Sequence, residues 1–171
     1  MKILPIGIEE WKSIIQFYSE LTKNLRKNGV YQWDRFYPNR FTIKEDLKQG
    51  HLFGMYDGKQ LVGAIVLDRK ESKKYKHLQW EDVVGKPLVI HRLGVHPLYQ
   101  GNGYGKMLLH FAEEFALSHE HSSIRLDVYS GNPGALALYE GKGYKRVGTI
   151  KFPFRAVPYF CFEKKLNTRE F

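Results

Sequence analysis

The sequence has little of what marks secreted or membrane proteins. Cys161 is the only cysteine among 171 residues, so no disulfide can form within the chain and a reducing compartment is expected. No apolar run approaches the roughly 20 residues that a membrane-spanning helix needs. Near the N-terminus, Glu9 and Glu10 interrupt the sequence before the apolar core of a signal peptide can form. Together these features predict a cytoplasmic protein without a membrane partner.

The sequence also lacks internal repeats and linker-like stretches, so a single domain over residues 1–171 is expected. Its composition is globular, with 43% hydrophobic and 26% charged residues. The formal net charge of +9 admits nucleic acid, a membrane surface or a phosphate-rich small ligand as a partner. The chain has no helix lined with basic residues, no zinc-ligand spacing and no RNP-like aromatic strand, so no nucleic-acid partner is expected.

The hydrophobic pattern predicts four helices between seven strands. Apolar residues at helical spacing predict a helix from Trp11 that ends near Asn28. Thr42 and Glu45 have the spacing of a capping box, which predicts a second helix ending near Gly50. Later helices are expected to begin near Tyr104 and at Asn132-Pro133, and strands at 2–6, 51–56, 60–67, 87–95, 123–129, 144–150 and 159–165.

The order of these elements predicts a mixed sheet flanked by helices. Asp57-Gly58 is a hairpin signal, which predicts an antiparallel pair. The strand–turn–helix–strand run at 88–129 is typical of a parallel crossover.

A glycine-rich turn precedes the third predicted helix. It reads Val95-His96-Pro97-Leu98-Tyr99-Gln100-Gly101-Asn102-Gly103-Tyr104-Gly105-Lys106. Its three glycines allow a tight turn and expose N–H groups at a helix start, where the helix dipole attracts an anion such as a diphosphate. The turn is not a P-loop or a dinucleotide fingerprint, since Lys106 stands where each motif needs a glycine. A plain glycine turn without a ligand is the alternative.

Gln100-x-x-Gly103-x-Gly105 after a Val-x-Pro strand end resembles the coenzyme A signature of the GNAT superfamily of N-acetyltransferases. The resemblance implies the GNAT fold, an α/β (α+β) arrangement with a mixed, mostly antiparallel central sheet of about seven strands flanked by four helices. It also implies acetyl-CoA as the co-substrate and no metal. The implied coenzyme contacts are Leu93, Gly94, Val95, Gln100, Gly101, Asn102, Gly103, Tyr104, Gly105, Lys106, Asn132, Ala135 and Tyr139.

The segment from Asn132 to Tyr144 is similar to the second signature of the same family. By resemblance, Asn132 contacts the pantetheine or phosphate arm, and a plain helix N-cap is the alternative. Tyr139 lies two helical turns further on the same face. The resemblance implies that Tyr139 is the general acid that protonates the leaving thiolate, and a core tyrosine is the alternative.

The acceptor amine must lose a proton before it attacks the thioester. Glu81 and His91 are candidate general bases, with Asp127 as a third candidate. A solvated loop charge and a hydrogen-bonded core histidine are the respective alternatives, and a water relay needs none of these residues. Acceptor binding is expected at Trp33, Tyr37, Phe154 and Arg155, although aromatic residues also fill ordinary cores.

The sequence thus predicts direct transfer of an acetyl group from acetyl-CoA to a primary amine of a small molecule or peptide. The alternative is a catalytically inactive acyl-CoA-binding sensor or interaction module. No metal site is expected at His119 and His121, because i, i+2 spacing does not put both rings on one helix face. The acceptor stays open, as does the choice between a monomer and the homodimer common in the family.

Overall fold

The protein is described by a computed structural model that covers residues 1–167. Contacts divide the chain into two compact units. Unit 1 comprises Met1–Leu67 and His91–Leu109, and unit 2 comprises Asp68–Ile90 and the chain from His110 onward. The expectation of one domain over 1–171 stays a prediction.

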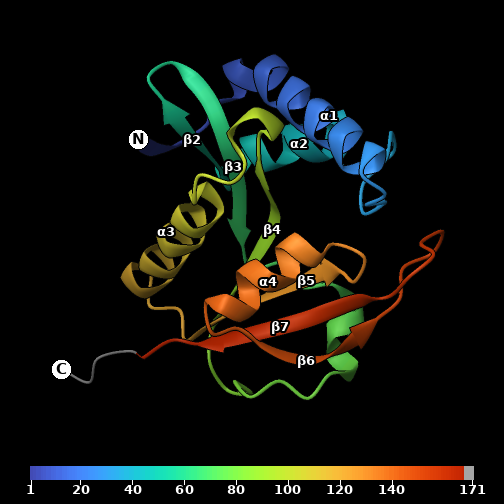
Figure 1. The fold of residues 1–171 in the computed structure, drawn as a ribbon. Coiled ribbons are helices and arrows are strands. Elements are labelled where there is room, and N and C mark those ends of the chain that lie inside the picture. The colour runs from blue at the N-terminus through green and yellow to red at the C-terminus, as the bar shows by residue number, and fades with distance from the viewer. Residues whose placement is uncertain (168–171) are drawn as a thin grey trace. The chain divides into compact units, whose positions relative to one another are not determined.

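The four helices and seven strands expected from the pattern are all present (Figure 1). The helices are α1 (Trp11–Lys27), α2 (Arg40–Lys48), α3 (Tyr104–Ser118) and α4 (Pro133–Gly141). The strands are β1 (Lys2–Pro5), β2 (Leu52–Asp57), β3 (Gln60–Asp68), β4 (Pro87–Val95), β5 (Ser123–Tyr129), β6 (Lys145–Ile150) and β7 (Tyr159–Lys165). Short 3-10 helices are η1 (Ile8–Glu10), η2 (Lys73–His77) and η3 (Pro97–Tyr99).

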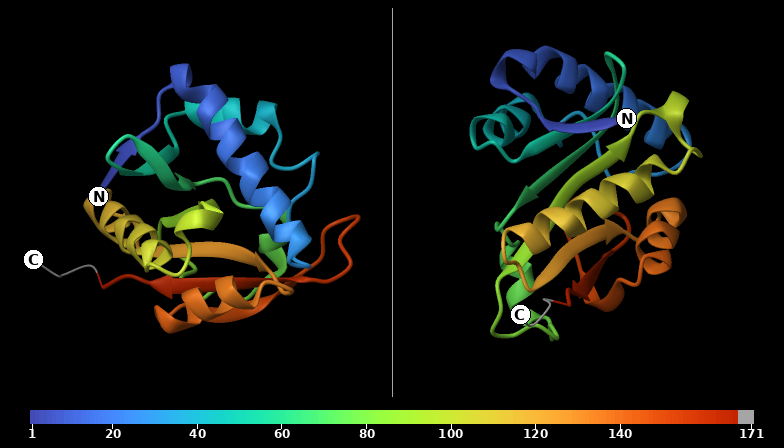
Figure 2. Two further views of the ribbon diagram at one scale, coloured as in Figure 1. Left: turned by 45° about the horizontal axis from the view of Figure 1, so that its top comes forward. Right: turned by 90° about the vertical axis from the view of Figure 1, so that its left-hand side faces the viewer.

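The strands form one sheet in the order β1-β2-β3-β4-β5-β7-β6. Pairs β1–β2, β2–β3, β5–β7 and β6–β7 are antiparallel, and β4–β5 is parallel. The last antiparallel pair can be followed in orange and red in both views of Figure 2. A parallel pair needs a crossover, which the chain makes through α3. The expected mixed, mostly antiparallel sheet is therefore confirmed.

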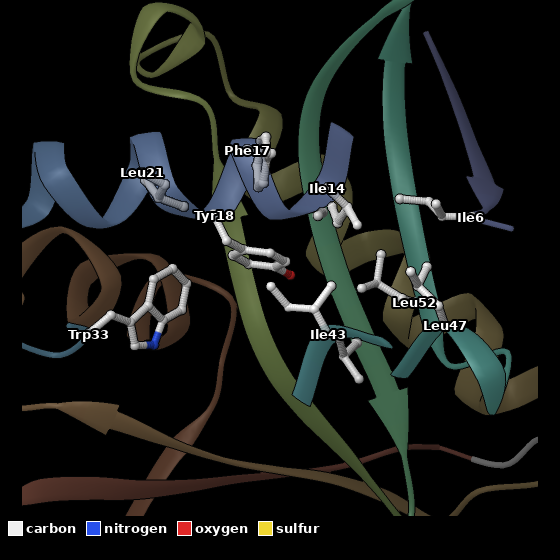
Figure 3. Packing of buried hydrophobic residues seen from close by; sticks show 11 residues of the cluster. Ile6, Ile14, Phe17, Tyr18, Leu21, Trp33, Ile43, Leu47 and Leu52 are labelled. Carbon is white, nitrogen blue, oxygen red and sulfur yellow. The ribbon is translucent and has the colours of Figure 1, made fainter. Parts of the chain in front are cut away.

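Unit 1 is held together by apolar side chains from α1, α2 and the β2–β3 hairpin. Helix α1 buries one face because its apolar residues recur three or four positions apart. Figure 3 shows Ile14 and Tyr18 of α1 pointing toward Ile43 of α2. The labelled members of this buried cluster are Ile6, Ile14, Phe17, Tyr18, Leu21, Trp33, Ile43, Leu47 and Leu52. Full burial of a side chain such as Ile14 contributes roughly 1.5–3 kcal/mol to stability.

The capping-box prediction for α2 is wrong. The helix begins at Arg40, and Asn39 is its N-cap, with a side chain that accepts from Phe41 N and Thr42 N. Thr42 lies inside the first turn and uses its own N–H to bond to Asn39 at 3.0 Å. Asparagine is a preferred N-cap, so the helix starts at the first residue able to satisfy its free N–H groups.

Unit 2 carries a buried polar network between β5, β7 and the segment that precedes β4. Arg125 is 7% exposed and donates from Nε to Glu163 Oε1 at 3.1 Å. Asp82 accepts hydrogen bonds from Ser122 and Ser123 at 2.5 and 2.6 Å. Burial alone raises the pKa of Asp82, but these bonds and the charge of Arg125 outweigh it and lower the pKa. Because its charges are paired, the network can be buried.

Candidate functional site

The glycine turn lies within unit 1, between β4 and α3. Gly101 and Gly103 have φ of +82° and +79°, a left-handed conformation that only glycine adopts without strain. Gly105 already belongs to α3, so two glycines and not three make the turn. A Cβ atom added at either turn glycine would meet nothing within 4 Å, so the space over this backbone is open.

The turn presents the start of α3. The first intrahelical bond runs from Met107 N to the Gly103 carbonyl at 3.1 Å. The N–H groups of the first helical turn, which precede Met107, have no intrahelical acceptor and carry the positive end of the helix dipole. The Lys106 side chain adds an exposed positive charge. This set of donors fits a diphosphate.

Two side chains fix the turn to the backbone that precedes it. Gln100 donates from Nε2 to the Val95 carbonyl at 3.0 Å, and Asn102 donates from Nδ2 to the Tyr99 carbonyl at 3.0 Å. The fixed glutamine of the signature therefore ties the turn to the end of β4, and Asn102 closes it locally.

His96 is a further anchor of the turn, which the sequence reasoning missed. Its Nδ1 accepts from Leu98 N at 3.3 Å, and its Nε2 lies 2.7 Å from Glu20 Oε2. With Nδ1 as the acceptor, Nε2 carries the proton and donates it to Glu20. Hydrogen bonds from Gln16 and then from His96 lower the pKa of Glu20. The start of η3 is thereby tied to α1.

Arg92 interrupts the regular geometry of β4 just before the predicted coenzyme contacts Leu93, Gly94 and Val95. Its φ is +48°, a left-handed value for a non-glycine residue. Gly94 is buried, and a Cβ atom there would lie only 2.3 Å from Leu21 Cδ2. A side chain at position 94 therefore has no room unless Leu21 moves.

The predicted acceptor residues differ in exposure. In unit 1, Trp33 is 7% exposed and stacks edge-on against Tyr18 with centroids 5.6 Å apart, whereas Tyr37 is 38% exposed. In unit 2, Phe154 is fully exposed. Arg155 is half-buried and forms a hydrogen bond that opposes the rise in the pKa of Tyr159 caused by burial. Trp33 thus belongs to the core, and the roles of all four stay predictions.

The second signature forms the start and body of α4 in unit 2. Asn132 is the N-cap, and its Oδ1 accepts from Ala135 N at 3.1 Å. Tyr139 is 6% exposed and contacts the aromatic rings of Tyr144 and Phe162. Burial raises the pKa of Tyr139, and the carboxylate of Asp127 raises it further. The Tyr139 phenol is therefore protonated at neutral pH, as a proton donor must be.

The three candidate bases have different surroundings. The Glu81 side chain is 60% exposed, with an oxygen 4.0 Å from Lys165 Nζ. His91 is half-buried in β4 and has an interaction partner. The left-handed backbone at Arg92 follows His91, so the regular alternation of side chains along β4 is interrupted there.

Asp127 is half-buried in β5 and has phenols around it. Its Oδ2 accepts a hydrogen bond of 2.6 Å from the Tyr75 hydroxyl. Its charge contributes to raised pKa values at Tyr75, Tyr139 and Cys161, in each case after burial. Asp127 is thus electrostatically coupled to Tyr139, the predicted general acid. No spacing in the sequence indicated this coupling.

Within residues 1–167, no three His, Cys, Asp or Glu side chains gather to hold a metal ion. His119 stacks on Phe115 with centroids 4.0 Å apart, and His121 bonds through Nδ1 to the Lys86 carbonyl at 3.0 Å. In the same part of the chain, no helix is long and apolar enough to cross a bilayer.

A mixed seven-stranded sheet with a glycine turn leading into its third helix is the architecture of GNAT acetyltransferases. The family model described as "Acetyltransferase (GNAT) family" matches residues 11–144, and the chain belongs to this family. The predicted family and fold are therefore confirmed.

Three known proteins illustrate the similarity. "Uncharacterized N-acetyltransferase YesJ" of Bacillus subtilis is 26% identical over 165 residues, covering 95% of this chain and 89% of the relative. "N-alpha-acetyltransferase RimI" of Mycobacterium tuberculosis is 42% identical over 122 residues, covering 71% and 69%. The crystal structure of a GNAT-family acetyltransferase from Streptococcus agalactiae has a similar fold, with a TM-score of 0.81, 18% identity, and coverage of 96% and 94%.

The sequence did not reveal the residues whose contacts support the end of β4 and the glycine turn. These residues are Tyr18, Asp46, Arg92 and His96. One signal was available for Asp46. It directly precedes the apolar Leu47 and lies three residues after Ile43, so it shares the buried face of α2 and requires a partner. Nothing in the pattern marks Arg92, because a left-handed backbone at arginine depends on its tertiary contacts.

Proposed function

We propose that the protein transfers an acetyl group from acetyl-CoA directly to a primary amine. The observation that carries this proposal is the turn at Gly101 and Gly103, whose left-handed backbone leads into the first turn of α3. Together with family membership, it supports binding of a diphosphate-bearing acyl donor. When bound, acetyl-CoA supplies an activated thioester.

In this proposal, the chain's part in binding is divided between backbone and side chains. Gln100 and His96 hold the turn, so that its N–H groups need no rearrangement to receive the diphosphate. The backbone of Leu93 and Val95 orients the acyl carbonyl and the pantetheine arm. A fixed N–H that faces developing negative charge contributes roughly 2.7–4 kcal/mol to lowering the barrier.

Tyr139 is the proposed general acid. The carbon–sulfur bond of the thioester breaks as the amine nitrogen bonds to the acetyl carbon, and the sulfur leaves as a thiolate. A phenol that is kept protonated by burial and by a neighbouring carboxylate can supply the proton that the sulfur takes up. Such proton transfer typically contributes 10²–10⁴-fold to the rate.

For the general base, Glu81 and His91 stay proposals, and the contacts add support for Asp127. Its carboxylate is half-buried, hydrogen-bonded by Tyr75 and coupled to Tyr139. A base and an acid that influence each other's protonation are typical of an acid–base pair. Exchanging each carboxylate for its amide, and His91 for glutamine, ranks the three candidates by loss of kcat.

The acceptor is proposed to be a primary amine, with an α-amino group as the first class to test. The reason is the similarity to a relative named as an N-alpha-acetyltransferase. Tyr37 supports the proposal of an acceptor surface in unit 1, since part of its ring is open to solvent.

The test is a coenzyme A release assay with purified protein, acetyl-CoA and a panel of amines. The panel holds short peptides with free α-amino groups, the same peptides with blocked N-termini and free lysines, and polyamines. Turnover with one class and not the others supports the proposal and identifies the acceptor. Binding of acetyl-CoA without turnover on any amine favours the inactive sensor. No calorimetric binding of acetyl-CoA overturns both.

A further inference from the structure

Arg92 has a backbone conformation that needs an explanation. A non-glycine residue with φ of +48° in a strand is strained, and it persists only when surrounding contacts impose it. The residue lies inside β4 and directly precedes Leu93, Gly94 and Val95. The direction taken by these last three residues of β4 therefore depends on what holds Arg92.

The Arg92 side chain is held by Asp46 of α2. Its Nε donates to Asp46 Oδ2 at 2.9 Å and its Nη2 donates to Asp46 Oδ1 at 2.6 Å, which is a bidentate pair. Both side chains are about nine-tenths buried, at 8% and 10% exposure. Planar guanidinium–carboxylate pairing fixes orientation as well as distance, which lysine cannot do.

The Arg92 backbone is held by Tyr18 of α1. The Tyr18 hydroxyl donates to the Arg92 carbonyl at 2.8 Å. Tyr18 is 1% exposed and packs edge-on against Phe17 and Trp33, so its hydroxyl has little freedom to move. The unusual backbone is therefore clamped on both sides, through its own carbonyl and through its side chain.

The third guanidinium nitrogen of Arg92 contacts Tyr37, one of the predicted acceptor-binding residues. Arg92 Nη1 donates to the Tyr37 hydroxyl at 2.7 Å. Tyr37 ends a tight turn in which Asp34 Oδ1 accepts from Phe36 N at 2.7 Å and from Tyr37 N at 3.0 Å. The turn is thus rigid in itself, and the bond to Arg92 sets where it lies on unit 1.

We infer that Arg92 is a positioning residue that orients two parts of the proposed transferase site, the end of β4 and the turn that carries Tyr37. The Arg92 backbone, held by Tyr18 and Asp46, determines the orientation of residues 93–95. The third guanidinium nitrogen, Nη1, holds the Tyr37 hydroxyl in place. The inference rests on the proposed function, because it assigns the acyl carbonyl to the first part and the acceptor to the second. Arg92 itself, with an 8% exposed side chain, does not touch the substrate.

The test separates the contact of Arg92 with Tyr37 from its contact with Tyr18 by deleting one hydroxyl at a time. In Tyr37→Phe, we expect the KM of the best amine from the panel to rise about tenfold while kcat and the acetyl-CoA Kd stay within twofold. In Tyr18→Phe, we expect kcat to fall about tenfold with the amine KM unchanged. Tyr56→Phe is the matched control, because its hydroxyl donates to Glu10 Oε2 at 2.9 Å, away from the turn and Arg92.

A ligand-free readout keeps this inference apart from the proposed function. Amide hydrogen exchange of residues 31–38 is expected to accelerate in Tyr37→Phe and in Arg92→Lys, and to stay at the wild-type rate in Tyr56→Phe. If Arg92→Lys does not fold, the two tyrosine variants still decide. Unchanged exchange in Tyr37→Phe, or equal kinetic changes in Tyr37→Phe and Tyr18→Phe, would overturn the inference. Lack of acetyl-CoA binding by the wild type would instead overturn the proposed function and leave the exchange result valid.

Discussion

The glycine turn of unit 1 and the α4 helix of unit 2 depend on different kinds of contact. The turn is built from main-chain conformation, with side chains such as Gln100 and His96 tying carbonyls and N–H groups in place. The α4 site is built around a buried side chain, Tyr139, whose protonation depends on burial and on Asp127. The glycine turn suits binding of the diphosphate of the proposed co-substrate, and the surroundings of Tyr139 suit the proposed proton transfer.

This contrast has a physical basis. Amide N–H groups do not titrate, so a main-chain anion site works equally at any ordinary pH. A phenol with its ordinary pKa of about 10 is already protonated at neutral pH, and burial beside Tyr144 and Phe162 keeps the proton on Tyr139 at still higher pH. Substitutions in the two regions should therefore separate binding from turnover.

The largest effect is expected at Tyr139. Tyr139→Phe keeps the ring packing and removes the proton, so kcat should fall by about 100-fold or more, while the acetyl-CoA Kd stays within twofold. Coenzyme A release and calorimetry measure the two quantities. Tyr129→Phe, another buried tyrosine of unit 2, is the control for loss of a hydroxyl. An unchanged kcat in Tyr139→Phe would break the contrast, since unit 2 would then contribute no acid.

At Gly103, the expected effect is on acetyl-CoA binding and not on turnover. Gly103→Ala forces a side chain into a backbone with φ of +79°, so the turn should shift and weaken acetyl-CoA binding about tenfold. Gly50→Ala is a close control, because Gly50 has φ of +69° and equally open surroundings at the end of α2. Both variants should lose similar stability in thermal melts. Equal loss of acetyl-CoA affinity in the two would remove the turn from the binding site.

A smaller effect is expected where His96 ties η3 to α1. His96→Ala removes the acceptor for Leu98 N and one of the two hydrogen-bond donors to Glu20, so the acetyl-CoA Kd should rise about three- to fivefold with kcat within twofold. Titration calorimetry against His110→Ala, an exposed histidine of α3, provides the comparison. A kcat loss larger than the loss of affinity would contradict an anchoring role.

The smallest effect on activity is expected from the polar network of unit 2. The folded-state pKa of Asp82 is lowered, so its stabilising contribution is present above the unfolded pKa of about 3.9 and is lost as the pH falls through the lower folded value. Asp82→Asn should lower Tm at pH 7, flatten the decline of Tm below about pH 5, and leave kcat unchanged. Melts of Asp57→Asn, at the exposed end of β2, serve as the reference. An acid decline as steep as that of the wild type would exclude Asp82 as its source.

The sequence predicted the fold well because its elements carry local signals. The hairpin at Asp57-Gly58, the N-cap at Asn132 and the glycine turn each depend on residues close together in the chain. The start of α2 was misplaced because two cap signals compete within a few residues, and Asn39 satisfies the free N–H groups first.

The site was predictable only in part, for the same reason. The glycine pattern indicates a main-chain anion site without knowledge of the fold. The pairs Arg92–Asp46 and Tyr75–Asp127 join residues 46 and 52 positions apart, so no spacing rule could have found them. Residues that position or tune a site through such long-range contacts become visible only when the chain is folded.

The close approach of Leu21 to Gly94 has a consequence for how the chain can vary. An added methyl at position 94 would lie 2.3 Å from Leu21 Cδ2, and Leu21 is itself 3% exposed, with little space to rotate. The two positions are therefore coupled: alanine at 94 requires that Leu21 move or be replaced by a shorter residue. Substitutions at position 94 of β4 and at position 21 of α1 are therefore coupled through this one packing contact.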